Sequence, residues 1–273
     1  MLLINIGCGS IYHHAWDNLD VYPSSPAVRR WDIRKGIPFP EGQADAVYAS
    51  HVIEHLSRSD AMSLAKECGR ALRSGGVIRF VVPDLEAMVS QYLRLLAAAE
   101  SMSAQVVADY DWILLELFDQ IVRTESGGDM FRYLTSRKVS NPEFVIARIG
   151  TEAERLMEEG STRGKNSMSS AASWGYYWTR LREKAAIQLC AFLLGRESKQ
   201  AMQHALLRHS GQLHLWMYDQ FSLDRFLREA GFVDIRRCNA MESRIPDFTT
   251  YNLDTDGGRV RKPDSLFMEA IKP

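Results

Sequence analysis

The feature that most constrains the fold is a series of short β-type runs in residues 1–85, separated by turns and by one helical segment. The runs cover residues 4–6, 19–21, 28–31, 46–49 and 77–82, and the last is apolar enough for burial on both faces. Between the last two, apolar residues recur at helical spacing over 59–73, and Ser74-Gly75-Gly76 is expected to close that helix. Strands joined by crossovers predict a parallel, doubly wound α/β sheet.

Residues 86–212 show a different periodicity, because apolar side chains such as Met88, Tyr92 and Leu96 recur three or four positions apart. Asn141-Pro142-Glu143 is typical of a helix start, with a capping residue, a proline in the first turn and an acid near the positive end of the dipole. The small, polar stretch 160–170 is predicted to be a loop. We therefore predict an all-helical insertion over residues 86–212.

Residues 213–273 return to an α/β pattern. Ser222 is predicted to cap a helix that runs through Ala230 and ends at Gly231. Further strands are predicted over 232–236 and 265–271. Residues 1–85 and 213–273 are thus predicted to form one core, which the helical insertion interrupts after the fifth strand.

Composition excludes several classes of protein. The chain has 273 residues, of which 46% are hydrophobic and 25% are charged, so it is neither disordered nor fibrous. Its 33 Lys and Arg and 34 Asp and Glu give a net charge of −1, which provides no overall positive field for nucleic acid. The cysteines are far apart, as is typical of free thiols in a reducing compartment; they are Cys8, Cys68, Cys190 and Cys238.

The sequence favours a cytoplasmic location. It opens with a predicted strand and not with a basic and apolar targeting segment. The longest strongly apolar run, residues 185–194, has about half the length that a membrane-spanning helix needs. We expect no transmembrane segment, while an amphipathic helix over 180–194 would allow peripheral contact with a membrane.

The first chemical signal is the glycine turn of Ile4-Asn5-Ile6-Gly7-Cys8-Gly9-Ser10. Two glycines allow close approach of the backbone to a ligand, and Asp20, after the next run, is placed to bind two ribose hydroxyls. The segment does not match a dinucleotide fingerprint, because Tyr12 occupies the third glycine position and no helix start follows. A tight turn beside a buried acid explains the pattern equally well.

Further segments extend this signal in a fixed order: Asn5-Ile6-Gly7-Cys8-Gly9, Ile37-Pro38-Phe39, Glu54-His55-Leu56 and Leu72-Arg73-Ser74-Gly75-Gly76. The series resembles class I S-adenosylmethionine-dependent methyltransferases, in the type 11-like group often found with polysaccharide biosynthesis. Gly231-Phe232 and the closing Ser265-Leu-Phe-Met-Glu-Ala-Ile-Lys resemble that group's last two strands. The resemblance covers about half of the chain and implies a Rossmann-like, seven-stranded mixed sheet.

The resemblance also implies a site for S-adenosylmethionine, which would leave as S-adenosylhomocysteine. The residues at matching positions are Gly7, Gly9, Asp20, Asp32, Ile33, Ser50 and His51. The glycines would lie under the methionine part, Asp20 would hold the ribose diol, and Asp32 would reach the adenine amino group. Ile33 would pack on the adenine ring, and the backbone at Ser50 and His51 would meet the sulfonium end.

Two departures from the group stand out. Asn5 replaces an acid that the group commonly has two residues before the first glycine, which weakens any contact with the cofactor's amino group. Ten residues separate Gly9 from Asp20, leaving little room for the usual first helix. We therefore predict that residues 10–16 form a loop that could cover the cofactor.

A competing interpretation is a metal site, because His51-Val-Ile-Glu54-His55 matches the H-x-x-E-H pattern of some zinc peptidases. On a helix both histidines would share a face and could bind a metal ion. The segment follows a predicted strand, however, and the sequence offers no clear third ligand. We therefore expect no metal.

His214-Leu-Trp216-Met-Tyr218-Asp219 provides candidates for catalysis. The doubly wound layout places this segment near the carboxyl ends of the strands, where ligands bind. We predict His214 as general base, with Asp219 beside it, and His51 as second choice. The alternative is an aromatic strip that faces the core with its polar tips satisfied.

The insertion carries an aromatic cluster followed by basic residues: Trp174, Tyr176, Tyr177, Trp178, Arg180, Arg182 and Lys184. Such residues suit a sugar or a phosphate, but they also suit packing onto the core or a homodimer contact. We predict methyl transfer to a hydroxyl or amine of a sugar, other glycan or small metabolite. The alternatives are a catalytically silent scaffold with the same fold and a different enzyme that uses the same cofactor.

Overall fold

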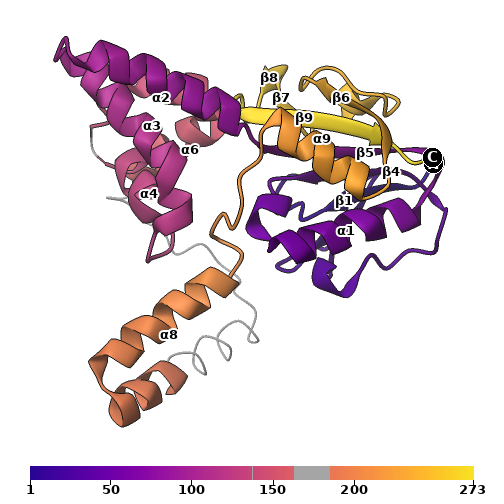
Figure 1. The fold of residues 1–273 in the computed structure, drawn as a ribbon, viewed down its shortest axis with the longest axis horizontal. Helices are drawn as coiled ribbons and strands as arrows, with labels where there is room; N and C mark the ends of the chain where they lie inside the picture. The colour runs from indigo at the N-terminus through magenta and orange to yellow at the C-terminus, as the bar shows by residue number, and fades with distance from the viewer. Residues whose placement is uncertain (137, 163–184) are drawn as a thin grey trace.

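The computed structural model describes residues 1–136, 138–162 and 185–273 (Figure 1). The aromatic and basic cluster between Trp174 and Lys184 lies outside the described residues, as does most of the predicted loop 160–170. None of the helices in the described ranges is both long and apolar enough to cross a membrane.

The core is a seven-stranded mixed sheet in the order β3-β2-β1-β4-β5-β9-β6. The strands are β1 Leu3–Ile6, β2 Asp17–Asp20, β3 Val28–Arg30, β4 Ala44–Ser50, β5 Leu72–Pro83, β6 Val233–Cys238 and β9 Ser265–Ile271. The first five are parallel, and β9 runs antiparallel to both β5 and β6. This confirms the predicted α/β fold, and it brings the carboxyl ends of β1, β2 and β4 to one edge.

Both faces of the sheet are covered. The helices α1, Arg58–Ala71, and α9, Gln220–Glu229, lie over one face and bury side chains such as Leu64 and Leu223 (Figure 1). On the other face Trp16 and Phe248 pack against Tyr48 of β4; Phe248 belongs to η3, Phe248–Tyr251. Burial on both sides explains why the central strands are apolar.

All regular secondary structure in the described part of the insertion is helical. It contains α2 Leu85–Ala99, α3 Ala104–Val122, α4 Gly128–Leu134, α5 Pro142–Ile149, α6 Thr151–Thr162, helical residues 185–194 and α8 Arg196–His209. Helix α2 begins directly after β5, where the Asp84 side chain accepts a hydrogen bond from Ala87 N. Figure 1 shows α2–α6 beyond the carboxyl end of β5, with α8 apart from the sheet.

Two predicted helix ends are wrong. Helix α9 is capped by Asp219, and Ser222 sits at its third position, where the two form a reciprocal capping box. Ser74-Gly75-Gly76 does not form a closing turn but belongs to β5, because Gly75 N donates to the carbonyl of Lys272 and Lys272 N donates to that of Gly76. Pairing with the far end of the chain overrides the local glycine signal.

Several short elements were not predicted from the sequence. Two single-turn 3-10 helices, η1 Ile33–Lys35 and η2 Ile53–His55, follow β3 and β4. A two-stranded hairpin of β7 Thr255–Asp256 and β8 Arg259–Val260 precedes β9. All of these lie near the carboxyl edge of the sheet, where they shape the candidate site.

Candidate active site

A cavity of about 440 Å³ opens at the carboxyl ends of β1 and β4. Gly7, Gly9, Ser50 and His51 of the predicted cofactor site line it, and so do residues that the sequence analysis did not single out. These include Glu152 and Arg155 of α6, Asp254, Arg261 and Lys262. The insertion thus contributes a wall of the cavity, together with the segment around the β7-β8 hairpin.

Gly7 and Gly9 both have a left-handed backbone, but they differ in the space that a side chain would find. Gly7 has φ +62°, and a Cβ there would lie 2.6 Å from Cγ2 of Val52, so both the backbone and a neighbour demand glycine. Gly9 has φ +55°, and a Cβ there would meet no atom within 4 Å. The open space beside Gly9 is what a bound ligand needs for close approach to the backbone.

Asp20 lies at the end of β2 and holds the glycine turn. Its Oδ2 accepts a hydrogen bond from Gly9 N at 2.8 Å, and its Oδ1 accepts one from Tyr22 N at 2.7 Å. A carboxylate has further lone pairs on both oxygens, so these bonds fix its position and still leave it able to accept hydroxyls. Asp20 therefore suits a ribose diol, although it does not line the cavity itself.

Asp32 and Ile33 follow β3 and lie outside the cavity lining. Asp32 accepts hydrogen bonds from Arg34 N and Arg34 Nε, and this contact is the main reason why the pKa of its carboxyl is lowered. Ile33 packs against the core. The structure therefore does not bring these two residues together with the glycines and His51 in one pocket.

Asn5 has a structural role that accounts for its departure from the group. It is buried, and its Nδ2 donates to the carbonyl of Ile11 at 3.2 Å and to Asn18 Oδ1 at 3.0 Å. These bonds tie β1 to β2 and to the connection that precedes β2. That connection contains no helix, as the short spacing predicted.

His51 is the imidazole that lines the cavity. It follows β4 with φ +54°, a left-handed conformation that is uncommon for a residue other than glycine and is often found at functional sites. Its backbone N donates to the carbonyl of Val81, and its Nε2 lies 3.0 Å from Ser265 Oγ. Its Nδ1 lies 3.1 Å from Glu54 Oε1. The ring is thus held between η2 and the start of β9.

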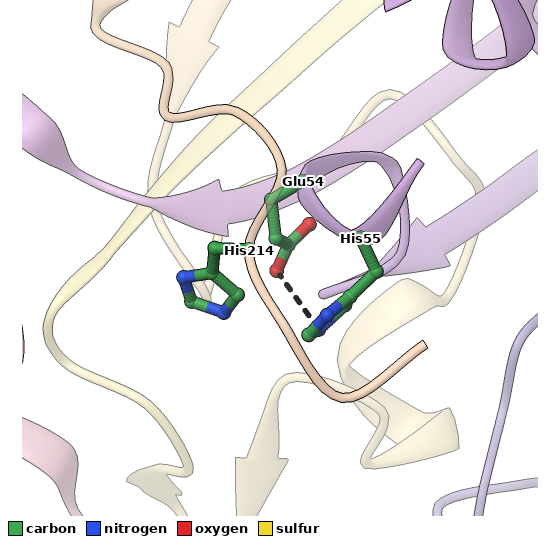
Figure 2. A group of neighbouring side chains, drawn as sticks. All are labelled: Glu54, His55 and His214. Carbon is green, nitrogen blue, oxygen red and sulfur yellow. Dashed lines mark ion pairs between the residues drawn. The ribbon is translucent and has the colours of Figure 1, made fainter. Parts of the chain in front are cut away.

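Glu54 is fully buried among three histidines, and Figure 2 shows its carboxylate between the rings of His55 and His214. Burial raises the pKa of this carboxyl, but His51, His55 and His214 outweigh burial and lower it to about 2. Burial lowers the pKa of His55 and takes that of His214 to about 3. Both rings are therefore uncharged at neutral pH beside an ionised carboxylate.

The other predicted catalytic residues lie elsewhere. His214 is buried beside Glu54 and does not line the cavity. Its low pKa makes it a weak base. Asp219 accepts a hydrogen bond from Ser222 N at 2.7 Å as the cap of α9, and it does not line the cavity either. Of the three predicted catalytic residues, only His51 lines the cavity.

The structure changes which residues could form the alternative metal site. His51 precedes η2, so it does not share a helical face with His55 as the H-x-x-E-H pattern requires. A third potential ligand exists, however, because His214 lies beside Glu54 and His55. No local pattern indicates this third ligand, since the contact joins segments on either side of the insertion.

A buried ionic network underlies the cavity and was not predicted. Arg79 of β5 is fully buried, with a nitrogen 2.7 Å from Asp254 Oδ2 and another 2.8 Å from Glu269 Oε1. Tyr48 donates to the other oxygen of Asp254, and both residues line the cavity. An arginine inside the otherwise apolar run 77–82 was the one sequence signal of this network.

Residues 12–80 match the sequence model of a family described as a methyltransferase domain. The resemblance to class I S-adenosylmethionine-dependent methyltransferases is confirmed. The match begins after the glycine turn and runs through β2, β3 and β4 into β5, so it includes Asp20, Asp32, Ser50 and His51 but neither Gly7 nor Gly9. No curated protein matches the chain.

Solved structures of methyltransferases are similar over different lengths. One, from Haloferax volcanii in complex with the Trm112 activator, is 19% identical with a TM-score of 0.26, over 32% of this chain and 47% of that one. A Thermotoga maritima enzyme is 10% identical with a TM-score of 0.36, over 100% and 82%. One from Archaeoglobus fulgidus is 11% identical with a TM-score of 0.37, over 99% and 85%. Similarity this low carries no argument about function.

Proposed function

We propose that the protein is a methyltransferase that moves a methyl group from S-adenosylmethionine to a hydroxyl or amine of a sugar or small metabolite. The observation that carries the proposal is the contact between Gly9 and Asp20. A left-handed glycine with open space beside it is fixed by a carboxylate from the neighbouring strand. The family match over residues 12–80 supports the same activity.

In this proposal the cofactor lies along the carboxyl ends of the parallel strands. Gly7 and Gly9 hold its methionine part and Asp20 its ribose. The adenine would extend out of the cavity toward Asp32 and Ile33, which follow β3 and do not line the cavity. Ser50 and His51, which end and follow β4, lie at its sulfonium end. The bound cofactor supplies an activated methyl group, so the chain's own task is to align the acceptor with it.

The rest of the cavity suits a polar acceptor. Glu152 of α6 lies 3.4 Å from Lys262, and both line the cavity together with Arg155. The cavity lining thus combines acidic and basic side chains with apolar ones such as Phe267. Such a lining offers hydrogen-bond donors and acceptors to a ligand with several hydroxyls. This supports a sugar or a hydroxylated metabolite as the class of acceptor.

For proton removal from the acceptor we propose His51, because it lines the cavity. His214 lies beside Glu54 and Asp219 caps α9, and neither residue lines the cavity in which the acceptor would bind. Replacing His51 by Ala is expected to lower turnover at least tenfold while cofactor affinity changes little, and His214→Ala is the matched comparison. A normal turnover in His51→Ala, with loss in His214→Ala, would reverse the assignment.

Calorimetric titration with S-adenosylmethionine and S-adenosylhomocysteine tests the cofactor site. We expect both to bind in the micromolar range, and Asp20→Ala to weaken binding at least tenfold. Asp17→Ala, an exposed position on the same strand, is the control and is expected to bind normally. Equal affinity of the Asp20→Ala variant and the natural protein would refute the ribose role.

A catalytically silent scaffold is the second function that the sequence allowed. The sequence features that suggested it were Asn5 and the short connection after Gly9. Hydrogen bonds from Asn5 to Ile11 and Asn18 give that residue a structural role. A scaffold also has no need for the space beside Gly9. Absence of cofactor binding in a folded sample is the result that would restore this alternative.

A further inference from the structure

We propose that Glu54, His55 and His214 bind a divalent transition-metal ion, with zinc as the preferred ion. Each residue offers one ligand atom, and these atoms all lie within 4.8 Å of one another. Figure 2 shows that the ligands come from two separate segments, η2 and the stretch that leads back from the insertion. The proposal is independent of the proposed methyl transfer.

The strongest indication is the Glu54 carboxylate. Its side chain is fully buried, and neither Oε1 nor Oε2 has a hydrogen-bond donor among the described residues. The 3.1 Å approach of His51 Nδ1 to Oε1 has an ion-pair distance without hydrogen-bond geometry. Burying a charge without such bonds costs free energy, and buried charges in proteins are therefore paired with an opposite charge or coordinate a metal ion.

The His55 ring is oriented as metal ligands commonly are. Its Nδ1 lies 3.0 Å from the carbonyl oxygen of Leu213, which can only accept, so Nδ1 carries the proton. Nε2 therefore has a free lone pair, and it lies 4.0 Å from Glu54 Oε1. A histidine whose other nitrogen donates to a backbone carbonyl is a recurrent arrangement around metals.

His214 completes the set from the other segment. Its side chain is buried, its backbone N donates to the carbonyl of Gln120 at 2.8 Å, and its ring centre lies 4.8 Å from that of His55. Two imidazoles and one carboxylate suit zinc, with a fourth position for water. Zinc ligands lie about 2.0–2.2 Å from the ion, so binding would draw the three side chains closer together.

The consequence of binding would be a clamp between the core and the end of the insertion. Leu215 N already donates to the carbonyl of Glu54 at 2.7 Å, so the two segments are in contact beside the ligands. A metal ion would add a second link at the same place and fix Glu54 next to His51 on the cavity wall. The clamp is therefore expected to raise stability.

The experiment uses the full chain, stripped of metal with a chelator and then titrated with Zn²⁺ by calorimetry and with Co²⁺ by visible absorption. We expect one equivalent to bind, a rise in Tm with Zn²⁺, and the absorption bands of tetrahedral Co²⁺. His214→Gln and His55→Gln are each expected to weaken Zn²⁺ binding at least tenfold. His209→Gln, at an exposed position in α8, is the matched control and is expected to bind normally.

Circular dichroism establishes that each variant is folded, and the partly exposed His55 provides the second variant if His214→Gln fails to fold. No Zn²⁺ binding by the folded natural protein would overturn the proposal. So would binding that persists unchanged in a folded His55→Gln or His214→Gln variant, since surface histidines would then account for it. Affinity for S-adenosylhomocysteine in the same samples separates this result from the fate of the methyltransferase proposal.

Discussion

The core and the insertion stabilise buried charges in different ways. In the core, Arg79 joins Asp254 and Glu269, so a single network links β5, β9 and the segment before the β7-β8 hairpin. In the insertion, Arg148 pairs with Glu116 and joins only α5 to α3. The core network connects distant parts of the chain beneath the cavity, whereas the insertion's pair holds neighbouring helices together.

The comparison extends to hydrophobic burial. Helices α3–α6 enclose a small core of their own around Trp112 and Val145. Helix α8 buries none of the side chains that the structure describes for it. The sheet and the first part of the insertion are therefore held by packing. We expect changes in the core to affect both stability and the site.

The largest expected effect is that of Arg79→Met. It leaves two buried carboxylates without their shared cation, so the free energy of unfolding should fall by about 3–5 kcal/mol. Denaturant unfolding measures this change. Arg73→Met, in the exposed pair with Asp45, is the control on the same strand. Equal losses of stability in the two variants would show that the core network contributes no more than an exposed ion pair.

Arg148→Met should have a smaller effect, about 2 kcal/mol, because Glu116 keeps its hydrogen bond from Trp112 Nε1. Burial also raises the pKa of Glu116, so this carboxyl can take up a proton once its partner is gone. Affinity for S-adenosylhomocysteine should not change. A loss of cofactor affinity in this variant would show that the core and the insertion are coupled more tightly than the contacts indicate.

Gly9→Ala should cost about 1 kcal/mol for its left-handed backbone, since its Cβ meets no protein atom. Its main effect should be on the cofactor, with affinity at least tenfold weaker by calorimetry. Gly7→Ala, which adds a clash with Val52, should lose more stability than Gly9→Ala. Normal cofactor affinity in Gly9→Ala would mean that the open space is not used by the ligand.

The smallest expected effect is that of Arg228→Ala on α9. Its pair with Asp224 lies on the exposed surface of the helix, where solvent screens the charges. The denaturant midpoint should not move measurably. A clear shift would show that this exposed pair contributes measurably to stability despite solvent screening.

The fold could be predicted from local sequence because its strands are apolar and its helices periodic. The strand over 265–271 has the predicted bounds, and the absence of a first helix follows from the short spacing between Gly9 and Asp20. Asp219 and Ser222 both belong to residue types that cap helices, so the sequence alone could not decide between them.

The site was less predictable because its contacts join remote segments. The glycine turn and Asp20 were found from their local pattern, and the structure brings them together. The placement of His214 beside Glu54 depends on how the chain returns from the insertion, which no local pattern records. The same holds for Arg79, whose partners lie near the end of the chain.

The most direct test of the central claim is a crystal structure of the protein with S-adenosylhomocysteine. We expect the ribose hydroxyls within hydrogen-bond distance of Asp20 and the amino-acid part against the turn that contains Gly7 and Gly9. The sulfur should face the cavity beside His51. Crystals grown with saturating S-adenosylhomocysteine that lack it at this edge of the sheet, or hold it elsewhere, would refute the proposed cofactor site.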